Sequence, residues 1–248
     1  MSATLVQVVT ALATLVTSLT ALFTVLELRR QRMAQYQPTM AIEYQPVRIY
    51  KPAKSDYGRG FVICPEGTNP SRGHFPQGDV LLQLTNVGAG PALDVSYSWS
   101  FDELAAAECI AHVDSAAAAR LVIEEETLRF QADDYTSWSS DRVQKYRLGT
   151  LLALPGKPGP SLPLPLSYLE LLCMYFRAVE EPSVATMKHF PMPPLRLKVE
   201  YQDRGGEIRQ ISFNVALRLH FIASGGGPIP DCPGWENCAG GDLTVTAA

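Results

Sequence analysis

Apolar side chains dominate the first 28 residues, where the only ionised side chain is that of Glu27. The stretch from Ala3 to Leu26 would be about 36 Å long as an α-helix, enough to cross a hydrocarbon core of roughly 30 Å. No basic residue precedes the apolar run and no A-x-A site follows it, unlike a cleaved secretory signal. The pattern therefore predicts one uncleaved transmembrane helix that continues to about Gln35 and ends before Pro38. A buried or coiled-coil helix of a soluble protein is the alternative.

Hydroxyl, amide and small residues repeat along this helix at spacings of three and four, which places them on one face. They are Gln7, Thr10, Thr14, Thr17, Ala21 and Thr24. In a membrane such a stripe lets helices approach closely and form hydrogen bonds with each other. Threonine also bonds to the backbone of its own helix. Three interpretations stay open: a homo-oligomer associated through the stripe, a lone anchor, and a pore lined by the stripe.

The basic cluster Arg29, Arg30 and Arg32 directly follows the apolar run, and no basic side chain precedes it. By the positive-inside rule, this asymmetry predicts that the C-terminal domain lies in the cytoplasm. The lipid bilayer is therefore the first expected partner. The three arginines would lie in the headgroup region, where they favour anionic lipid.

Three later stretches alternate apolar and polar residues with a period of two: Leu93–Ser100, Leu195–Gln202 and Ile211–Phe221. This alternation is typical of antiparallel strands with one buried face. Between the last two stretches, Asp203, Gly205 and Gly206 form a turn signal that predicts a hairpin. The expected fold is mainly β: an N-terminal transmembrane helix followed by an antiparallel β-sandwich.

Two helical inserts are expected in this domain, at about 102–119 and 167–180. The first is rich in alanine, and the second begins with a capping box in which Ser167 caps the helix and Glu170 reaches back. Because the second helix is apolar nearly all round, we expect it to be buried against the sandwich; a membrane surface or another subunit is the alternative. The predicted division is an anchor and juxtamembrane helix at 1–37, the β domain at 38–223 and a flexible Gly- and Pro-rich tail at 224–248.

A glycine-containing segment follows a predicted strand and includes Asn86, Gly88, Gly90 and Pro91. It lacks the third glycine of a dinucleotide-binding loop. A strand follows it, so no helix N-terminus is available to hold a pyrophosphate. We interpret the segment as a tight turn between two strands, with glycines that supply positive φ. No cofactor is expected.

The segment T-N-V-G-A-G-P-A-L-D-V (Thr85–Val95) follows an N-terminal anchor and precedes a late strand and turn, L-K-V-E-Y-Q-D-R-G-G (Leu197–Gly206). In this combination the chain resembles bacterial single-pass membrane-anchored proteins of unknown function with a β-sandwich-like domain. The resemblance implies a fold and a location in the inner membrane of a bacterial cell. It transfers no site residue and no activity, because its motifs are strand and turn signatures.

Candidate chemistry is sparse in the rest of the sequence. The histidines at positions 74, 112, 189 and 220 are scattered, and none has metal-ligand spacing. Cys232 and Cys238 would form a loop disulfide only in an oxidising compartment. The carboxylate clusters Glu124–Glu126 and Asp133–Asp134 are expected at a solvated edge. The sequence contains no G-x-S-x-G, H-E-x-x-H or Walker motif, so we expect no metal site and no enzymatic activity.

The remainder of the chain is acidic. Without Glu27 and the three arginines after it, 24 acidic residues stand against 18 basic ones. This balance argues against a nucleic-acid partner. We expect a membrane-tethered, non-enzymatic module that binds an unknown protein partner or a small ligand, or organises an assembly, at the cytoplasmic face of the membrane. An oligomerising effector whose span forms a pore is the alternative, and an enzyme with an unrecognised site at the carboxylates comes third.

Overall fold

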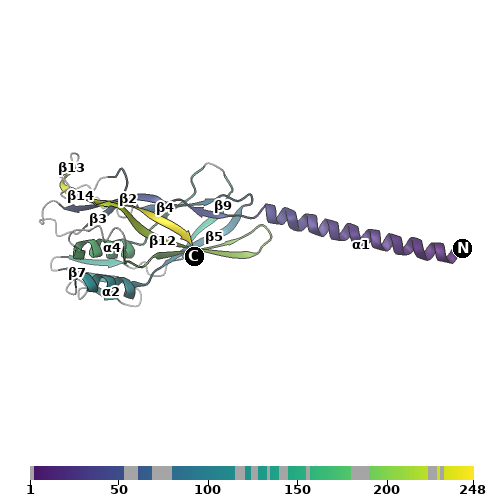
Figure 1. Ribbon diagram of the computed structural model, residues 1–248, viewed down its shortest axis with the longest axis horizontal. Coiled ribbons are helices and arrows are strands. Elements are labelled where there is room, and N and C mark those ends of the chain that lie inside the picture. The colour runs from purple at the N-terminus through teal and green to yellow at the C-terminus, as the bar shows by residue number, and fades with distance from the viewer. Residues whose placement is uncertain are drawn as a thin grey trace.

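The chain forms a long N-terminal helix followed by a β domain with two inserted helices (Figure 1). The structure is a computed structural model, and it describes residues 3–52, 61–68, 80–114, 121–123, 128–132, 135–139, 145–154, 157–179, 190–222, 228–229 and 232–248. Figure 1 shows the long helix leaving one end of the domain and the inserted helices at the opposite end. The predicted class, an apolar helix followed by a mainly antiparallel β domain with helical inserts, is confirmed.

Helix α1 spans Ala3–Gln35, and its described side chains are exposed along the whole length. By length and composition, Val6–Arg32 is a candidate membrane span, the one such helix among the described residues. The Tyr36 N–H still donates to the Arg32 carbonyl at 3.1 Å. Pro38 then lacks the N–H that would continue the helix. The predicted helix end near Gln35 is therefore confirmed.

One large sheet forms most of the domain, with eight strands in the order β3-β2-β14-β12-β11-β5-β9 and β13 paired to β14. The bounds are Val62–Pro65 (β3), Gln45–Pro52 (β2), Cys232–Ala247 (β14), Ile208–Ile222 (β12), Leu195–Gln202 (β11), Ala92–Ser100 (β5), Lys145–Leu151 (β9) and Pro228–Ile229 (β13). All of these neighbours are antiparallel. Strands β11 and β12 form the predicted hairpin, with Gln202 opposite Ile208 beside the turn.

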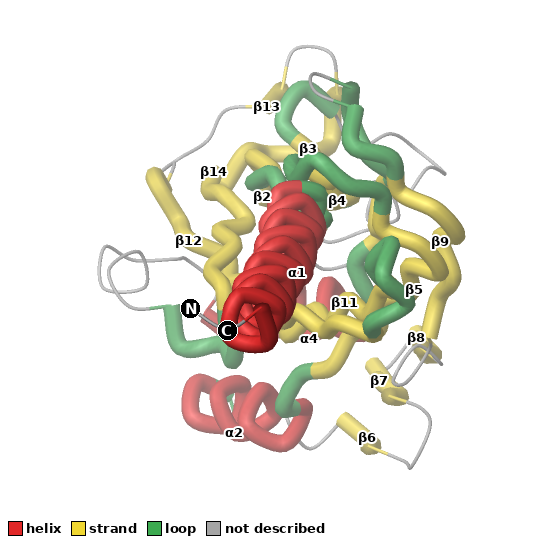
Figure 2. The backbone as a smooth tube through the Cα atoms, turned by 90° about the vertical axis from the view of Figure 1, so that its right-hand side faces the viewer, coloured by secondary structure: helices red, strands yellow, loops and turns green. Residues whose placement is uncertain are grey.

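Two smaller sheets complete the β structure. Strands β1 (Met40–Ile42), β4 (Leu81–Asn86) and β10 (Ser161–Pro163) form the first, and β6 (Leu121–Ile123), β7 (Leu128–Ala132) and β8 (Tyr135–Ser139) form the second. Viewed from the α1 end, the strands surround a central core (Figure 2). The predicted sandwich is thus unequal, because the large sheet curves as a half-barrel and the opposing layer is small.

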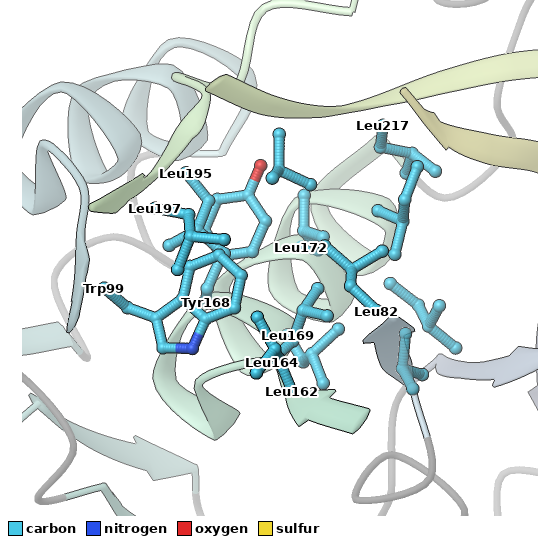
Figure 3. Packing of buried hydrophobic residues seen from close by; sticks show 14 of the residues in the cluster. Leu82, Trp99, Leu162, Leu164, Tyr168, Leu169, Leu172, Leu195, Leu197 and Leu217 are labelled. Carbon is cyan, nitrogen blue, oxygen red and sulfur yellow. The ribbon is translucent and has the colours of Figure 1, made fainter. Parts of the chain in front are cut away.

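Helix α4 (Leu166–Val179) occupies the core, as predicted for the second insert. Nine of its residues, from Ser167 to Phe176, are buried. Figure 3 shows Tyr168, Leu169 and Leu172 of this helix among apolar side chains of the surrounding strands. Those labelled around them are Leu82, Trp99, Leu162, Leu164, Leu195, Leu197 and Leu217. The helix therefore fills the interior of the half-barrel, and its burial explains why it is apolar nearly all round.

The predicted capping box of α4 was wrong. The helix begins one residue earlier, and the carbonyl of Pro165 accepts from the Leu169 N–H at 3.2 Å. Ser167 lies inside the first turn, and its buried hydroxyl has no hydrogen-bond partner. The first insert, α2 (Glu103–Val113), is capped by Asp102, whose carboxylate accepts from the Ala105 N–H at 2.9 Å. It ends at Val113, and residues 115–120 lie outside the described part of the chain.

The predicted flexible tail was also wrong for residues 232–247. These residues form β14, which lies between β12 and β2 in the middle of the large sheet. Leu243 is buried there, opposite Leu217 on one side and Gln45 on the other. A Cβ on Gly241 would lie 2.3 Å from the Arg218 carbonyl oxygen, so glycine permits a close backbone approach at this point. The β domain therefore extends to Ala247 and does not end at residue 223.

Candidate functional site: the junction of helix and domain

Asn86 stands at the end of β4, where the domain meets the segment that follows α1. It is 3% exposed. Its Oδ1 accepts from the N–H groups of Thr39 and Gly88, both at 3.1 Å. Its Nδ2 donates to the carbonyls of Gly90 at 2.7 Å and Leu151 at 3.2 Å. One side chain thus ties the connector, which we define as residues 36–39, to its own turn and to the end of β9.

The two glycines of this turn let the connector lie directly on it. A Cβ on Gly88 would lie 2.4 Å from the Gln37 carbonyl oxygen, and a Cβ on Gly90 would lie 1.7 Å from the Tyr36 carbonyl oxygen. Neither glycine has a positive φ. The expectation that they supply positive φ was therefore wrong. Glycine is needed here because backbone packs on backbone, and any side chain would displace the connector.

The predicted turn between β11 and β12 has an internal network of its own. Gly206 has φ +84°, the left-handed conformation that favours glycine. The Asp203 carboxylate accepts from the Gly205 N–H at 2.8 Å, the Glu207 N–H at 3.0 Å and Nε of Arg209 at 2.9 Å. The hydrogen bond from Arg209, supported by the two N–H groups, lowers the pKa of Asp203. The turn is thus held in one shape with its carboxylate ionised.

An open groove of about 790 Å³ runs between α1 and this hairpin turn. It is lined by Val25, Leu28, Arg29, Arg30, Arg32, Tyr36, Gln37, Asp203, Arg204, Gly205, Glu207 and Arg209. Its two carboxylates both pair with Arg209, whereas four further arginines line it. The groove is therefore basic, although the chain has a net charge of −4. The structure brings the predicted juxtamembrane arginines together with Arg204, which the sequence analysis did not single out.

The predicted association stripe lies on exposed α1. Each of its four threonines, at positions 10, 14, 17 and 24, donates its hydroxyl to the carbonyl four residues earlier, at 2.8 or 2.9 Å. Gln7 and Ala21 are exposed on the same helix. The hydroxyl groups are thus satisfied within one helix, so they need no second helix to avoid unpaired polar groups in lipid.

Of the other candidate groups, those in the described part of the chain lie apart from one another. His112 is exposed at the end of α2, and the imidazole of His220 pairs with the Asp242 carboxylate on the exposed side of the sheet. Positions 74 and 189 and both carboxylate clusters, 124–126 and 133–134, lie outside the described residues. Within the described ranges, no group of three His, Cys, Asp or Glu side chains could hold a metal ion.

Three cysteines among the described side chains, Cys64, Cys109 and Cys173, are not joined in disulfides. Cys64 and Cys173 are buried, and the Cys109 thiol donates to the Pro191 carbonyl at 3.3 Å. Cys232 and Cys238 both belong to β14. Their side chains lie outside the described part of the chain, so the predicted loop disulfide stays a prediction.

Sequence reasoning found the turn residues but missed what they hold. The connector was not identified as their partner, nor was Tyr201, whose hydroxyl donates to the Pro38 carbonyl at 3.5 Å. The turn contains two glycines close together, and such a turn indicates that a backbone segment packs directly on it. That signal does not say which segment.

Comparisons with protein-family models, with curated proteins and with solved structures find no match to this chain.

Proposed function

We propose that this chain is a membrane-tethered, non-enzymatic binding or assembly module, anchored by α1 with its β domain on the cytoplasmic face of a bacterial inner membrane. The observation that carries the proposal is the junction itself. An exposed apolar helix long enough to span a bilayer is followed directly by the four-residue connector, which Asn86, Gly88 and Gly90 hold on the domain. The domain is thus held at the anchor and not suspended on a flexible linker.

The same junction supports an anchor that is retained. A signal sequence shares the length and apolar character of α1, but it is removed and orients nothing afterwards. Here the turn is shaped around residues 36–39, which directly follow the helix. Arg29, Arg30 and Arg32 lie on the domain side of the apolar run, which supports the cytoplasmic side.

The polar groups of the junction support a binding role over catalysis. The amide of Asn86 makes four hydrogen bonds, and the carboxylate of Asp203 makes three. Asn86 bonds to backbone groups, and Asp203 bonds to two backbone N–H groups and to Arg209, so both side chains are occupied in holding the structure. The alternative, a pore through the threonine stripe, gains no support from hydroxyls that already bond to their own helix.

Topology is tested with a cysteine at the exposed end of the domain. The variant Ala248→Cys is expressed in bacterial cells and treated with a membrane-impermeant maleimide before and after lysis, with the parent chain as the control for native thiols. The proposal expects the additional labelling only after lysis, with the chain in the carbonate-resistant membrane pellet. Additional labelling of intact cells contradicts the cytoplasmic side, and a carbonate-soluble chain contradicts the anchor. Scrambling α1 at constant hydrophobicity should leave the tether intact; a pore would be lost.

A further inference from the structure

Exposed apolar side chains gather at the α1 end of the domain. Outside α1, nine large apolar side chains among the described residues are exposed. Five of them lie on or beside connections at this end: Tyr36, Val87, Leu152, Leu154 and Ile208. Ile208 is the most exposed of all, at 79%. Turns exposed to water are ordinarily polar, so a cluster of apolar side chains on them indicates an interaction surface.

The hydrogen bonds place these connections together. Val87 belongs to the turn that carries the connector, and the Leu151 carbonyl accepts from Asn86 in that turn, so Leu152 follows directly at the same end. Ile208 is the first residue of β12, beside the hairpin turn that shares a groove with α1. Figure 1 shows this hairpin reaching to the base of α1, and Figure 2 looks onto the same end with α1 pointing at the reader.

Basic side chains lie on the same end. Lys157 follows the exposed leucines, and Arg204 is at the tip of the hairpin. None of the ion pairs within the described part of the chain involves Lys157, Arg204 or the three arginines of α1. Of the acidic groups near the hairpin turn, Asp203 and Glu207 pair with Arg209, and Glu200 pairs with Lys145 and Lys198. Asp94 is exposed in the same hollow as Ile208 and is the one acidic side chain of this set outside those pairs. An apolar surface with unpaired basic groups complements the acyl boundary and phosphates of lipid headgroups.

The length of α1 fixes how far this end is from a bilayer. If the hydrocarbon ends near Leu28, the helix continues for seven residues to Gln35, or about 10 Å. The polar layer on one side of a bilayer is about 5 to 8 Å thick. The connections at the base of α1 would therefore face the headgroups within reach of a long side chain.

We infer that the α1 end of the domain docks on the lipid headgroup surface, with Val87, Leu152, Leu154 and Ile208 at the interface and Lys157 and Arg204 on anionic headgroups. This inference rests on the proposed tether. It goes further by naming a surface of the domain itself as a lipid-binding face, so that the membrane holds the domain at a second place besides the span. The opposite end, with α2, then faces away from the membrane and is free for a protein partner.

Tryptophan quenching by spin-labelled lipid tests the inference on the full-length chain in nanodiscs. The variant I208W places an indole on the docking face, and L104W places one on exposed α2 at the other end as the matched control. Nanodiscs of phosphatidylcholine, with and without phosphatidylglycerol, carry lipid labelled near the headgroup. The parent chain gives the background from its native tryptophans. The inference expects quenching above background for I208W, greater with phosphatidylglycerol, and none for L104W.

A second comparison separates docking from mere proximity. In the I208W background, each of K157Q and R204Q should lower the docked-to-free ratio about five-fold in anionic nanodiscs, whereas R218Q, an exposed arginine on β12 away from the turn, should not. Equal quenching in all three contradicts the role of the basic groups, and no quenching of I208W contradicts docking altogether. Elution of the parent chain apart from the nanodiscs would instead contradict the tether, so the two failures are distinguishable.

Discussion

Replacing Asn86 with alanine should loosen the junction between helix and domain. The change removes four hydrogen bonds, two from backbone N–H groups and two to carbonyls. A typical bond contributes about 1 kcal/mol net, and a buried group left unpaired costs about 1 to 3 kcal/mol. Thr39 is exposed and can turn its N–H to water, whereas Gly90 and Leu151 are buried. We therefore expect a loss of about 2 to 4 kcal/mol in the free energy of unfolding.

For a domain of this size, such a loss lowers the Tm by roughly 5 to 15 °C. The assay is thermal unfolding of the full chain in nanodiscs, combined with hydrogen exchange at the amides of Thr39 and Gly88, which should lose protection in N86A. The control is N214A, a half-buried asparagine on β12, for which we expect a loss below about 1 kcal/mol. Equal melting of the two variants, with unchanged exchange at Thr39 and Gly88, would refute the role of Asn86.

Four further changes test separate parts of the account. G90A places a Cβ where the connector lies and should lower the Tm at least as much as N86A; an unchanged melting curve would contradict the close approach. S167A should not destabilise the domain, because the hydroxyl makes no hydrogen bond; a loss of about 1 kcal/mol in denaturant unfolding would restore the capping box. The hydrogen bond from Lys145 lowers the pKa of Glu200 from 4.5 to about 2. The ionised carboxylate therefore stabilises the domain above about pH 4.5, and this stabilisation is lost as the pH falls towards 2. In E200Q the free energy of unfolding should change less with pH over that interval, and parallel pH curves for the two chains would contradict the role of Glu200. Deleting residues 240–248 should abolish the cooperative thermal transition, because it removes half of a central strand; a truncated chain that melts like the parent would show the segment to be dispensable.

The strands with one solvent-exposed face could be predicted, because alternating apolar and polar residues indicate which side chains are buried and which are exposed. The predicted stretch Leu195–Gln202 has the same bounds as β11, with leucine, valine and tyrosine turned to the core. The burial of α4 could also be predicted, because apolar residues lie on nearly all sides of the helix. In both cases the information is local, since each side chain reports its own environment.

The last strand could not be predicted in this way. Glycine and proline in 224–248 are typical of turns and disorder when the segment is considered alone. Strand β14 is stabilised by neighbours on both sides, and Gly241 is required by the closeness of β12. The glycine content that suggested a flexible tail is therefore due in part to the close packing of β14 against β12.

The junction shows the same limit. The turn at residues 86–91 was recognised, but its partner Thr39 is 47 residues away along the chain. Nothing in the local pattern of Asn86, Gly88 and Gly90 specifies which backbone they receive. The error over positive φ has the same origin, because a glycine required by close approach and a glycine required by φ look alike in sequence.

The central claim, that α1 is retained and carries the domain at the membrane, is tested most directly by the intact mass of the chain from membranes. The protein is expressed in bacterial cells, the carbonate-washed membrane fraction is isolated, and the chain is weighed by mass spectrometry. The account predicts a membrane-bound species at the full mass of 27.1 kDa, allowing for processing of the initiator methionine. A soluble species that has lost the residues of α1 would contradict it.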